Sequence, residues 1–348
     1  MSSCAVNIKD MKIGGGAPVL IQSMTNTDTR DVEATLDQIK ALAAAGCDIV
    51  RFSVYDRLCV GAVRSIVDRS PIPCVADIHF DHKLAIGAME NGIHKLRINP
   101  GNIGGVEKIR AVVDCARMHH VPIRIGVNSG SLEKDILDRN GGVTAAGMVE
   151  SALRHAKLLE EQGFYDIVLS LKASDVKTTV EAYRLATKSC DYPLHLGVTE
   201  AGLPGSGTVK SAIGIGSLLL DGIGDTIRVS LTADPCEEVN AALEILRALK
   251  IREGISFVSC PTCGRTRIDV ADVARKVKKE FENIKAPVRV AIMGCVVNGP
   301  GEARGADVAL CGGDNCGALY IHGKFIRKLT GDLAQEMIAA VKEYLHDL

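Results

Sequence analysis

Three cysteines in the C-terminal third of the chain have the type and spacing of a metal site. Cys260 and Cys263 are separated by Pro-Thr and followed by Gly264, and Cys295 lies in the glycine-rich stretch 293–302. Two thiolates two residues apart can bind one soft metal centre. Three thiolates leave one coordination position open on a cubane cluster. Glu302 can supply a labile oxygen ligand there, because Asn-Gly-Pro-Gly lets the chain curl back.

Three interpretations of these cysteines remain open from the residues alone. They are buried small hydrophobes, a zinc site, or ligands of an iron–sulfur cluster. The Cys-x-x-Cys turn with its glycine is too specific for simple packing. A zinc site would need Cys311 and Cys316 to complete four thiolates, and it would leave Cys295 without a role. An iron–sulfur cluster uses Cys260, Cys263 and Cys295 together.

A second group of candidates consists of cations near the ends of apolar segments. They are Arg51, Arg97, Arg124, Lys172 and Arg228. Any single one could form a structural ion pair, but only Asp77 and Glu200 lie at comparable positions to offset them. Burying unpaired cations costs several kcal/mol each. Since guanidinium groups match phosphate oxygens two at a time, an anionic ligand is indicated, and a diphosphate is the natural candidate.

Uncharged and acidic side chains at the same segment ends complete a binding site. His79 and His195 are candidates for proton donation or phosphate contact, or for structural hydrogen bonds. Glu200 is a candidate acid–base or hydroxyl-binding group. Asn99 and Asn128 suit neutral hydrogen bonds to substrate oxygens.

These residues need a scaffold that brings eight segment ends together. The chain repeats a short Val/Ile/Leu-rich run followed by a stretch of helical periodicity. The predicted strands are 19–24, 48–54, 73–79, 95–99, 122–128, 166–172, 193–199 and 225–231. The predicted helices are 31–45, 56–69, 82–91, 105–119, 144–162, 176–188, 208–220 and 235–249.

Eight strand–helix pairs predict a (β/α)8 TIM barrel, whose chemistry sits at the C-terminal ends of the strands. The rival is an open doubly wound sheet. The even count disfavours it, as does the absence of a glycine-rich dinucleotide turn after the first strand. Gly14-Gly15-Gly16 precedes that strand and is interpreted as a plain turn.

The regular alternation of strands and helices ends after Lys250, which predicts a smaller α+β domain. Strands are expected at 256–260, 288–293, 308–311 and 318–322, and helices at 269–283 and 332–346. The predicted domains are a substrate-binding barrel over 1–253 and a cluster domain over 254–348.

Composition limits the class of protein. Aromatic residues make up 3% of the chain, so large cores must be aliphatic, as in parallel α/β folds. The formal net charge of −1 argues against a nucleic-acid partner. No apolar run approaches the ~20 residues of a membrane span. Twelve cysteines without an N-terminal apolar signal segment indicate a reducing cytoplasm.

The cysteine motifs carry a resemblance to a known family. Ser259-Cys-Pro-Thr-Cys-Gly-Arg-Thr266 and Met293-Gly-Cys-Val-Val-Asn-Gly-Pro-Gly-Glu-Ala303 resemble the 4-hydroxy-3-methylbut-2-enyl diphosphate synthases. These are iron–sulfur enzymes of the non-mevalonate isoprenoid route. The resemblance covers the whole chain and includes Ile21–Thr27, Leu96–Gly101 and Gly197–Gly202. It implies the compact two-domain bacterial form.

The resemblance implies an oxidoreductase that opens 2-C-methyl-D-erythritol 2,4-cyclodiphosphate reductively, with loss of a hydroxyl as water. Two electrons would arrive singly from a flavodoxin or ferredoxin through a 4Fe–4S cluster. Family members are homodimers in which the cluster domain of one subunit caps the barrel of the other. This chain has no nucleotide fingerprint of its own, so an external electron carrier is expected.

The resemblance also implies roles for individual residues. The cluster ligands would be Cys260, Cys263, Cys295 and Glu302. The diphosphate would be bound by Arg51, Arg97, Arg124, Lys172 and Ser230. The remaining substrate groups would contact Asp77, His79, Asn99, Asn128, Thr199 and Glu200. The catalytic residues would be Glu302, at the open iron, and Glu200, which would handle the proton of the departing hydroxyl.

Overall fold

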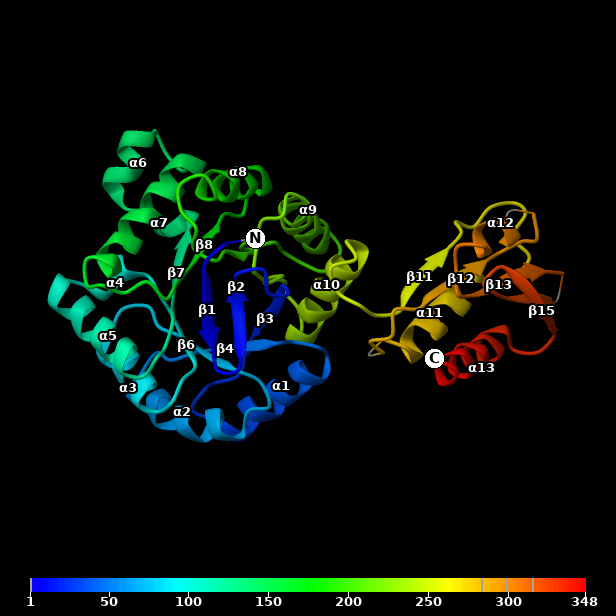
Figure 1. The fold of residues 1–348 in the computed structure, drawn as a ribbon, viewed down its shortest axis with the longest axis horizontal. Coiled ribbons are helices and arrows are strands. Elements are labelled where there is room, and N and C mark those ends of the chain that lie inside the picture. The colour runs from blue at the N-terminus through cyan, green and yellow to red at the C-terminus, as the bar shows by residue number, and fades with distance from the viewer. Residues whose placement is uncertain (1, 283, 298, 315) are drawn as a thin grey trace. The chain divides into compact units, whose positions relative to one another are not determined.

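The computed structural model describes residues 2–282, 284–297, 299–314 and 316–348, and of residue 302 it describes the backbone alone. Backbone contacts divide the chain into two compact units, Met1–Ile251 and Arg252–Leu348. The first unit is an α/β barrel and the second is a smaller α+β unit (Figure 1). Among the helices of the described segments, none is long and apolar enough to cross a bilayer.

Eight parallel strands form the barrel in the order β8-β7-β6-β5-β4-β3-β10-β9. They are β3 (Leu20–Met24), β4 (Ile49–Ser53), β5 (Cys74–Asp77), β6 (Lys95–Ile98), β7 (Ile123–Asn128), β8 (Ile167–Lys172), β9 (His195–Leu196) and β10 (Thr226–Ile227). The two ends of the sheet meet where Leu169 N donates to Pro193 O at 2.9 Å and Leu169 bridges Leu194. This seam confirms the predicted (β/α)8 barrel over the open doubly wound sheet.

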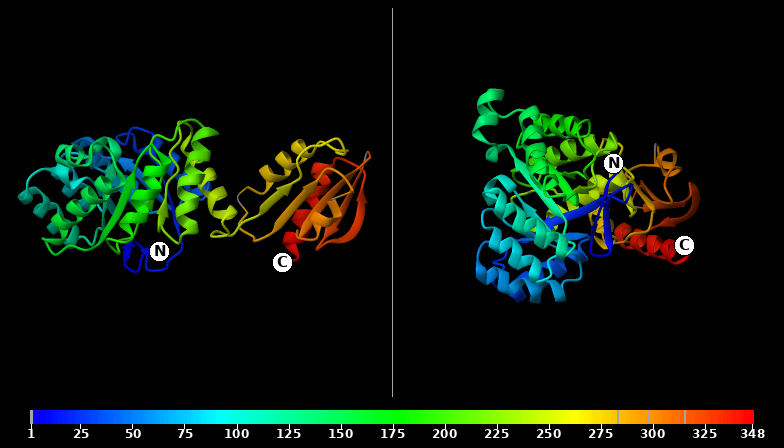
Figure 2. Two further views of the ribbon diagram at one scale, coloured as in Figure 1. Left: turned by 90° about the horizontal axis from the view of Figure 1, so that it is seen from above. Right: turned by 60° about the vertical axis from the view of Figure 1, so that its left-hand side comes forward.

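Helices surround the barrel on its outer side (Figure 2). They are α1 (Val32–Ala44), α2 (Arg57–Arg69), α3 (His82–Glu90), α4 (Pro100–Ile103), α5 (Val106–Met118), α6 (Lys134–Asn140), α7 (Ala145–Glu160), α8 (Val176–Ala186), α9 (Ser206–Leu220) and α10 (Pro235–Ala248), with a 3-10 turn at Ser129–Ser131. The short α4 and α6 were not expected.

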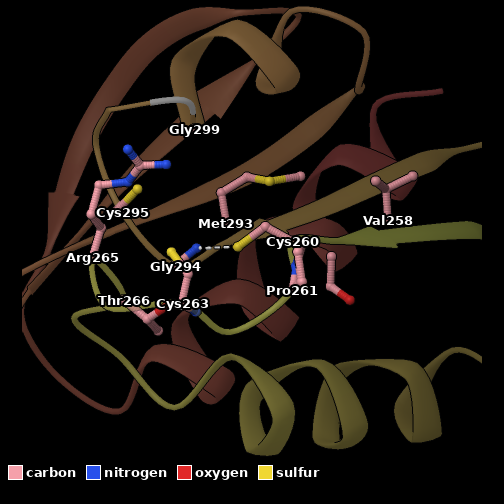
Figure 3. Close-up of a pocket in the computed structure, with 11 residues that line it drawn as sticks. Val258, Cys260, Pro261, Cys263, Arg265, Thr266, Met293, Gly294, Cys295 and Gly299 are labelled. Carbon is pink, nitrogen blue, oxygen red and sulfur yellow. Dashed lines mark hydrogen bonds between the residues drawn. The ribbon is translucent and has the colours of Figure 1, made fainter.

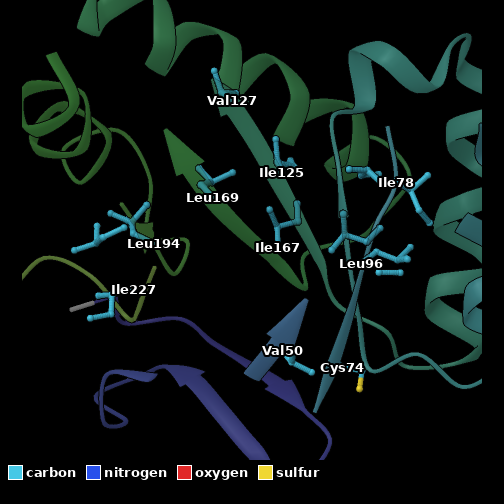
Figure 4. Close-up of a cluster of buried hydrophobic side chains, with 14 of the residues drawn as sticks. Val50, Cys74, Ile78, Leu96, Ile125, Val127, Ile167, Leu169, Leu194 and Ile227 are labelled. Atoms are coloured by element: carbon cyan, nitrogen blue, oxygen red, sulfur yellow. The ribbon is translucent and has the colours of Figure 1, made fainter. Parts of the chain in front are cut away.

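Local sequence explains where these helices begin and what they cover. The carboxylates of Asp31 and Asp56 accept hydrogen bonds from the N–H groups three residues on, as N-caps do. The outward side chains of the strands, such as Val50, Ile125 and Leu169, form the buried layer beneath the helices (Figure 4). Alternate residues therefore point into the barrel.

An N-terminal hairpin closes the bottom of the barrel. Its strands are β1 (Ala5–Ile8) and β2 (Met11–Gly14), which pair antiparallel. Hairpin side chains, including Ile8 and Ile13, share an apolar cluster with inward-facing residues near the strand starts, including Ile49. The plain-turn interpretation of residues 14–16 was therefore incomplete, because Gly14 ends β2. A side chain at Gly14, where φ is +82°, would collide with the carbonyl of Cys4.

The second unit is built on one five-stranded sheet in the order β11-β12-β13-β14-β15. The strands are β11 (Ser256–Ser259), β12 (Arg289–Met293), β13 (Val308–Gly313), β14 (Cys316–Ile321) and β15 (Lys324–Leu329). The first three are parallel and the last three are antiparallel. β15 was not expected.

Different helices pack on the two faces of this sheet. The long helices α11 (Val270–Glu280) and α13 (Leu333–His346) pack on one face over an aliphatic core. The short α12 (Gly299–Ala303) packs on the other face through Ala303, against Met293 and Cys311. The glycine-rich stretch 293–302 leads into a helix that was not expected, because residues 299–303 form α12.

Candidate active site

The predicted substrate-binding cations stand inside the barrel. Arg51, Arg97, Arg124 and Lys172 are all buried, and all occupy inward positions of their strands. Arg97 and Arg124 are direct partners across β6 and β7, so their side chains leave the backbone side by side. The strand geometry thus concentrates like charges in one place, which is unfavourable without an anion.

Glycines on neighbouring strands make room for these long side chains. A Cβ added at Gly126 would lie 2.5 Å from Arg97 Nε, and one at Gly197 would lie 2.7 Å from Lys172 Nζ. Both positions face the barrel interior. The sequence interpretation missed them, although a glycine within a strand is a known signal of close approach.

Asp77 is a carboxylate that lies close to Arg51, Arg97 and His79. Its oxygens lie 3.2 Å from Arg97 Nη1, 3.9 Å from Arg51 Nε and 3.4 Å from His79 Nε2. Burial alone would raise the pKa of Asp77, but the charges of Arg51 and Arg97 and the hydrogen bond from His79 hold it well below its ordinary value. Asp77 is therefore a fixed anion that orients two guanidinium groups.

Lys172 and His195 form a buried chain of hydrogen bonds. Lys172 Nζ lies 3.1 Å from His195 Nε2, and His195 Nδ1 lies 2.8 Å from Thr226 Oγ1. Burial, together with the charge of Lys172, lowers the pKa of His195 well below its ordinary value. A neutral imidazole can accept from the Lys172 ammonium and donate to Thr226. This geometry suits holding Lys172 in place more than donating a proton.

Two charged residues of this interior were missed. Lys95, on the same face of β6 as Arg97, is 0% exposed, and its ammonium has no hydrogen-bond partner among the described residues. Glu238, in the first turn of α10, lies 3.3 Å from Arg228 and 3.1 Å from Ser23 Oγ. Arg228 is thus paired. A lysine two positions before Arg97 was a visible signal, whereas Glu238 resembled an ordinary helix-start acid.

Arg124 is the least satisfied of the buried guanidinium groups. It is 1% exposed and donates through Nη1 to Ser170 Oγ at 2.9 Å. Its Nε and Nη2 atoms lack a partner within the described residues. Donors that are buried and unpaired in this way are costly unless a ligand accepts from them.

The remaining predicted residues ring the C-terminal ends of the strands. Asn99 caps α4 by accepting from Gly101 N at 3.1 Å, and Asn128 ends β7. Thr199 and Glu200 follow β9, and Ser230 follows Arg228 by two positions. Glu200 is exposed and has a φ of +52°, which is uncommon for a residue with a side chain. The strain at this turn is of the kind that functional sites retain.

In the second unit, Cys260, Cys263 and Cys295 line one pocket of about 400 Å³ (Figure 3). Gly294 N donates to Cys260 Sγ at 3.0 Å. A side chain at Gly294 would come within 2.8 Å of Val270 and 2.9 Å of Thr266. The glycine therefore lets the backbone approach the sulfur, as in protein sites for iron–sulfur clusters.

The surroundings of Cys263 favour its anionic form. The Arg265 backbone N–H, followed by the Thr266 side chain, lowers the pKa of Cys263. In contrast, burial raises the pKa of Cys311 to about 12, and nearby Cys295 and Cys260 add to this. Without a bound metal, Cys311 thus favours the neutral thiol.

The described residues contain no group of three metal-donor side chains gathered round one point. Glu302 belongs to α12, but its side chain lies outside the described residues, so its predicted position is untested.

The fold and these two sites define a class: a TIM-barrel protein with buried cations in its interior, followed by a thiol-bearing α+β module. Two family descriptions match the chain, the GcpE TIM-barrel domain over residues 3–243 and the GcpE protein C-terminal domain over residues 256–344. The chain belongs to the GcpE family.

Curated relatives are similar along nearly the whole chain. A protein from Geobacter sulfurreducens is 56% identical over 342 residues, covering 98% of this chain and 97% of the relative. One from Caldanaerobacter subterraneus subsp. tengcongensis is 55% identical over 344 residues, covering 97% of both. Both relatives are named 4-hydroxy-3-methylbut-2-en-1-yl diphosphate synthase (flavodoxin).

Two solved structures of other enzymes share the fold over 71% of this chain. The 3-dehydroquinate dehydratase of Geobacillus kaustophilus aligns with a TM-score of 0.51 at 14% identity, covering 71% of this chain and 98% of that one. The 7,8-dihydropteroate synthase of Vibrio fischeri aligns with a TM-score of 0.51 at 12% identity, with the same coverage. At these identities the likeness concerns the fold and not the activity.

Proposed function

We propose that the chain is an oxidoreductase of isoprenoid biosynthesis. It converts 2-C-methyl-D-erythritol 2,4-cyclodiphosphate into 4-hydroxy-3-methylbut-2-enyl diphosphate with two electrons and two protons. The bond from carbon to the ring diphosphate breaks, and one hydroxyl leaves as water. The family and the names of its close relatives support this activity. The structural observation that carries this proposal is the group of buried cations in the barrel, several of whose donor atoms have no partner among the described residues.

The proposed substrate site follows the polarity of the barrel. The diphosphate lies deepest, where Arg51, Arg97, Arg124 and Lys172 supply cationic donors and Ser230 a hydroxyl. Asp77 keeps the guanidinium groups of Arg51 and Arg97 aligned. The carbon skeleton lies nearer the rim, with His79, Asn99, Asn128 and Thr199. Glu200 at the exposed rim handles the proton of the departing hydroxyl.

The proposed cofactor is a 4Fe–4S cluster held by Cys260, Cys263, Cys295 and Glu302. When bound, it supplies single electrons at low potential. The N–H of Gly294 stabilises the Cys260 thiolate. Residues 1–253 are the proposed substrate-binding domain and residues 254–348 the cluster domain.

The names of the relatives support a flavodoxin as electron donor, and a ferredoxin is the alternative that the sequence left open. We also propose a cytoplasmic homodimer, with no nucleic-acid or membrane partner. Light scattering of the purified holoenzyme tests the dimer, and a monomer at working concentration would contradict it.

The activity is tested with protein purified and reconstituted without oxygen. Turnover of the cyclic diphosphate with dithionite and methyl viologen is expected, along with about four iron and four sulfide per chain, as a cubane requires. Stoichiometric zinc without sulfide would overturn the proposal. Glu302→Ala is expected to lose most turnover and to bind the cluster less tightly, so near-normal turnover would remove Glu302 from the site.

A further inference from the structure

One face of the five-stranded sheet is only half covered. The short α12 contacts β12 and β13, and no described helix covers the same face over β14 and β15. A hollow of about 210 Å³ lies on this open part, with Cys311, Ala318 and Lys328 in its lining. The feature is separate from the thiol pocket, and none of the roles proposed above uses it.

The hollow adjoins the thiol pocket. Val296, which lines the hollow, follows Cys295 in the chain. A Cβ added at Gly299, which lines the thiol pocket, would lie 2.8 Å from Cys311 Sγ, and Cys311 lines the hollow. Residues that line the two pockets are therefore in direct contact. Because electron tunnelling weakens steeply with distance, a surface this close to the thiol pocket suits a partner that delivers electrons there.

The rim of the hollow combines exposed apolar groups with positive charge. Phe325 is 60% exposed and meets Tyr320 edge to face at 5.9 Å, and Val296 is 58% exposed. The ammonium group of Lys328 forms no ion pair within the described residues, and Arg265 is a further cation at the adjoining thiol pocket. Exposed aromatic and cationic side chains on an uncovered face are typical of sites for protein partners.

A β-bulge brings these groups onto the same face. The pairing of β14 with β15 shifts between Leu319 and Tyr320, so Lys328 pairs with Ala318 while Phe325 pairs with Tyr320. Without the shift, Phe325 and Lys328 would point to opposite faces. Lys324 pairs with Ile321 and points to the other face, which makes it a matched control.

We propose that the open face of β14 and β15, centred on the hollow over Cys311, is the docking surface for an acidic flavodoxin-type electron donor. This inference rests on the proposed function. In each encounter the reduced flavin of the donor gives up one electron to the cluster site, and two encounters supply one turnover. A small, mixed apolar and cationic patch suits a partner that must bind and leave twice.

The test compares Lys328→Glu with Lys324→Glu in anaerobic holoenzyme of equal iron and sulfide content. With a reduced bacterial flavodoxin as donor, Lys328→Glu is expected to lower kcat/KM for the donor about tenfold at low salt, because it reverses a charge that steers association. The loss should shrink at high salt. Lys324→Glu should remain within about twofold. Turnover with dithionite and methyl viologen should be the same for the unsubstituted enzyme and for both variants.

A direct binding measurement supplies a second readout. In calorimetric titrations with the same flavodoxin, Lys328→Glu should weaken the Kd about tenfold at low salt, with Lys324→Glu unchanged. Equal effects of the two substitutions, or none, would overturn the proposal and leave Lys328 as a charge that protects an edge strand from aggregation. Loss of a dimer in Lys328→Glu would overturn it in favour of a subunit contact. Absence of turnover with viologen in the unsubstituted enzyme would instead contradict the proposed function itself.

Discussion

In the barrel, the cations proposed to bind substrate stand on regular strands and are buried, whereas the thiols of the second unit stand on loops. Cys263 is exposed, and Cys260 and Cys295 are half-buried. The barrel cations are held by neighbouring strands and by Asp77 before any ligand arrives. The thiol loops have fewer such supports. The difference indicates that the barrel is organised in advance of its ligand, while the thiol pocket depends more on the group it binds.

The largest expected effect separates the two regions. Cys295→Ser should lower turnover by more than the roughly hundredfold that loss of an outer metal partner costs, because a direct ligand is removed. Iron content should fall, while the Kd of the barrel for the cyclic diphosphate should stay within about twofold. Iron analysis and calorimetry measure the two quantities. A Cys295→Ser protein with a full cluster would remove Cys295 from the ligand set.

A substitution in the barrel should have the opposite effect, with weaker substrate binding and unchanged iron content. Arg124→Met should weaken substrate binding by about 2–5 kcal/mol, because a buried charged donor to the diphosphate is lost. Iron content and thermal stability should not fall. Arg110→Met, on the exposed side of α5, is the control. An unchanged Michaelis constant in Arg124→Met would contradict the phosphate assignment.

Backbone geometry at the thiol pocket is the third test. Gly294→Ala should accelerate cluster loss in air about tenfold, because the added methyl group would press on Val270 and Thr266 and displace the N–H that meets Cys260. Gly264→Ala is the matched control, since a Cβ there has no neighbour within 4 Å. The decay of visible absorbance measures the rate. Similar decay in both variants would show that close approach at Gly294 is not required.

The smallest expected effect concerns the buried ammonium group of Lys95 inside the barrel. Lys95→Met should raise the free energy of unfolding by about 1–4 kcal/mol near neutral pH, because it replaces a buried, unpartnered ammonium. Burial, followed by the charges of Arg124 and Arg51, lowers the pKa of Lys95 well below its ordinary value. The unfolded chain therefore binds more protons at this site than the folded chain.

The stability of the unsubstituted protein should consequently rise with pH in the range between the lowered pKa of Lys95 and its ordinary value of about 10.4. The advantage of Lys95→Met should shrink over the same range. Denaturant unfolding at pH 7 and pH 9.5 measures it. A Lys95→Met protein that is less stable at both pH values would mean that the ammonium has a favourable role in the empty barrel.

Much of the proposed substrate site followed from the two-residue period of β-strands. Arg51, Arg97, Arg124 and Lys172 were placed at inward positions because each lies in an apolar strand, and strand alternation is a local property. The same rule could have included Lys95. The pairing of Arg228 with Glu238 could not be predicted in this way, because it joins a strand end to the start of α10 and depends on their distance in space.

The gathering of Cys260, Cys263 and Cys295 at one pocket was predicted, but the surroundings of that pocket were not. The spacing of Cys260 and Cys263 is a local motif with a chemical meaning. The close approach of Gly294, the helix α12 and the added strand β15 depend on how the sheet is covered. Short, glycine-rich or edge segments carry weak periodicity, so packing decides their conformation.

The sequence by itself determined the alternation of strands and helices, the inward cations and the three cysteines, because each is encoded within a few neighbouring residues. Tertiary structure alone decided which charges are neutralised, how the N-terminal hairpin seals the barrel floor, and which sheet face stays open. Those outcomes depend on contacts between residues far apart in the chain. The hairpin meets Ile49 and Val75 across the barrel, and the shifted register of β15 turns Phe325 and Lys328 to one side.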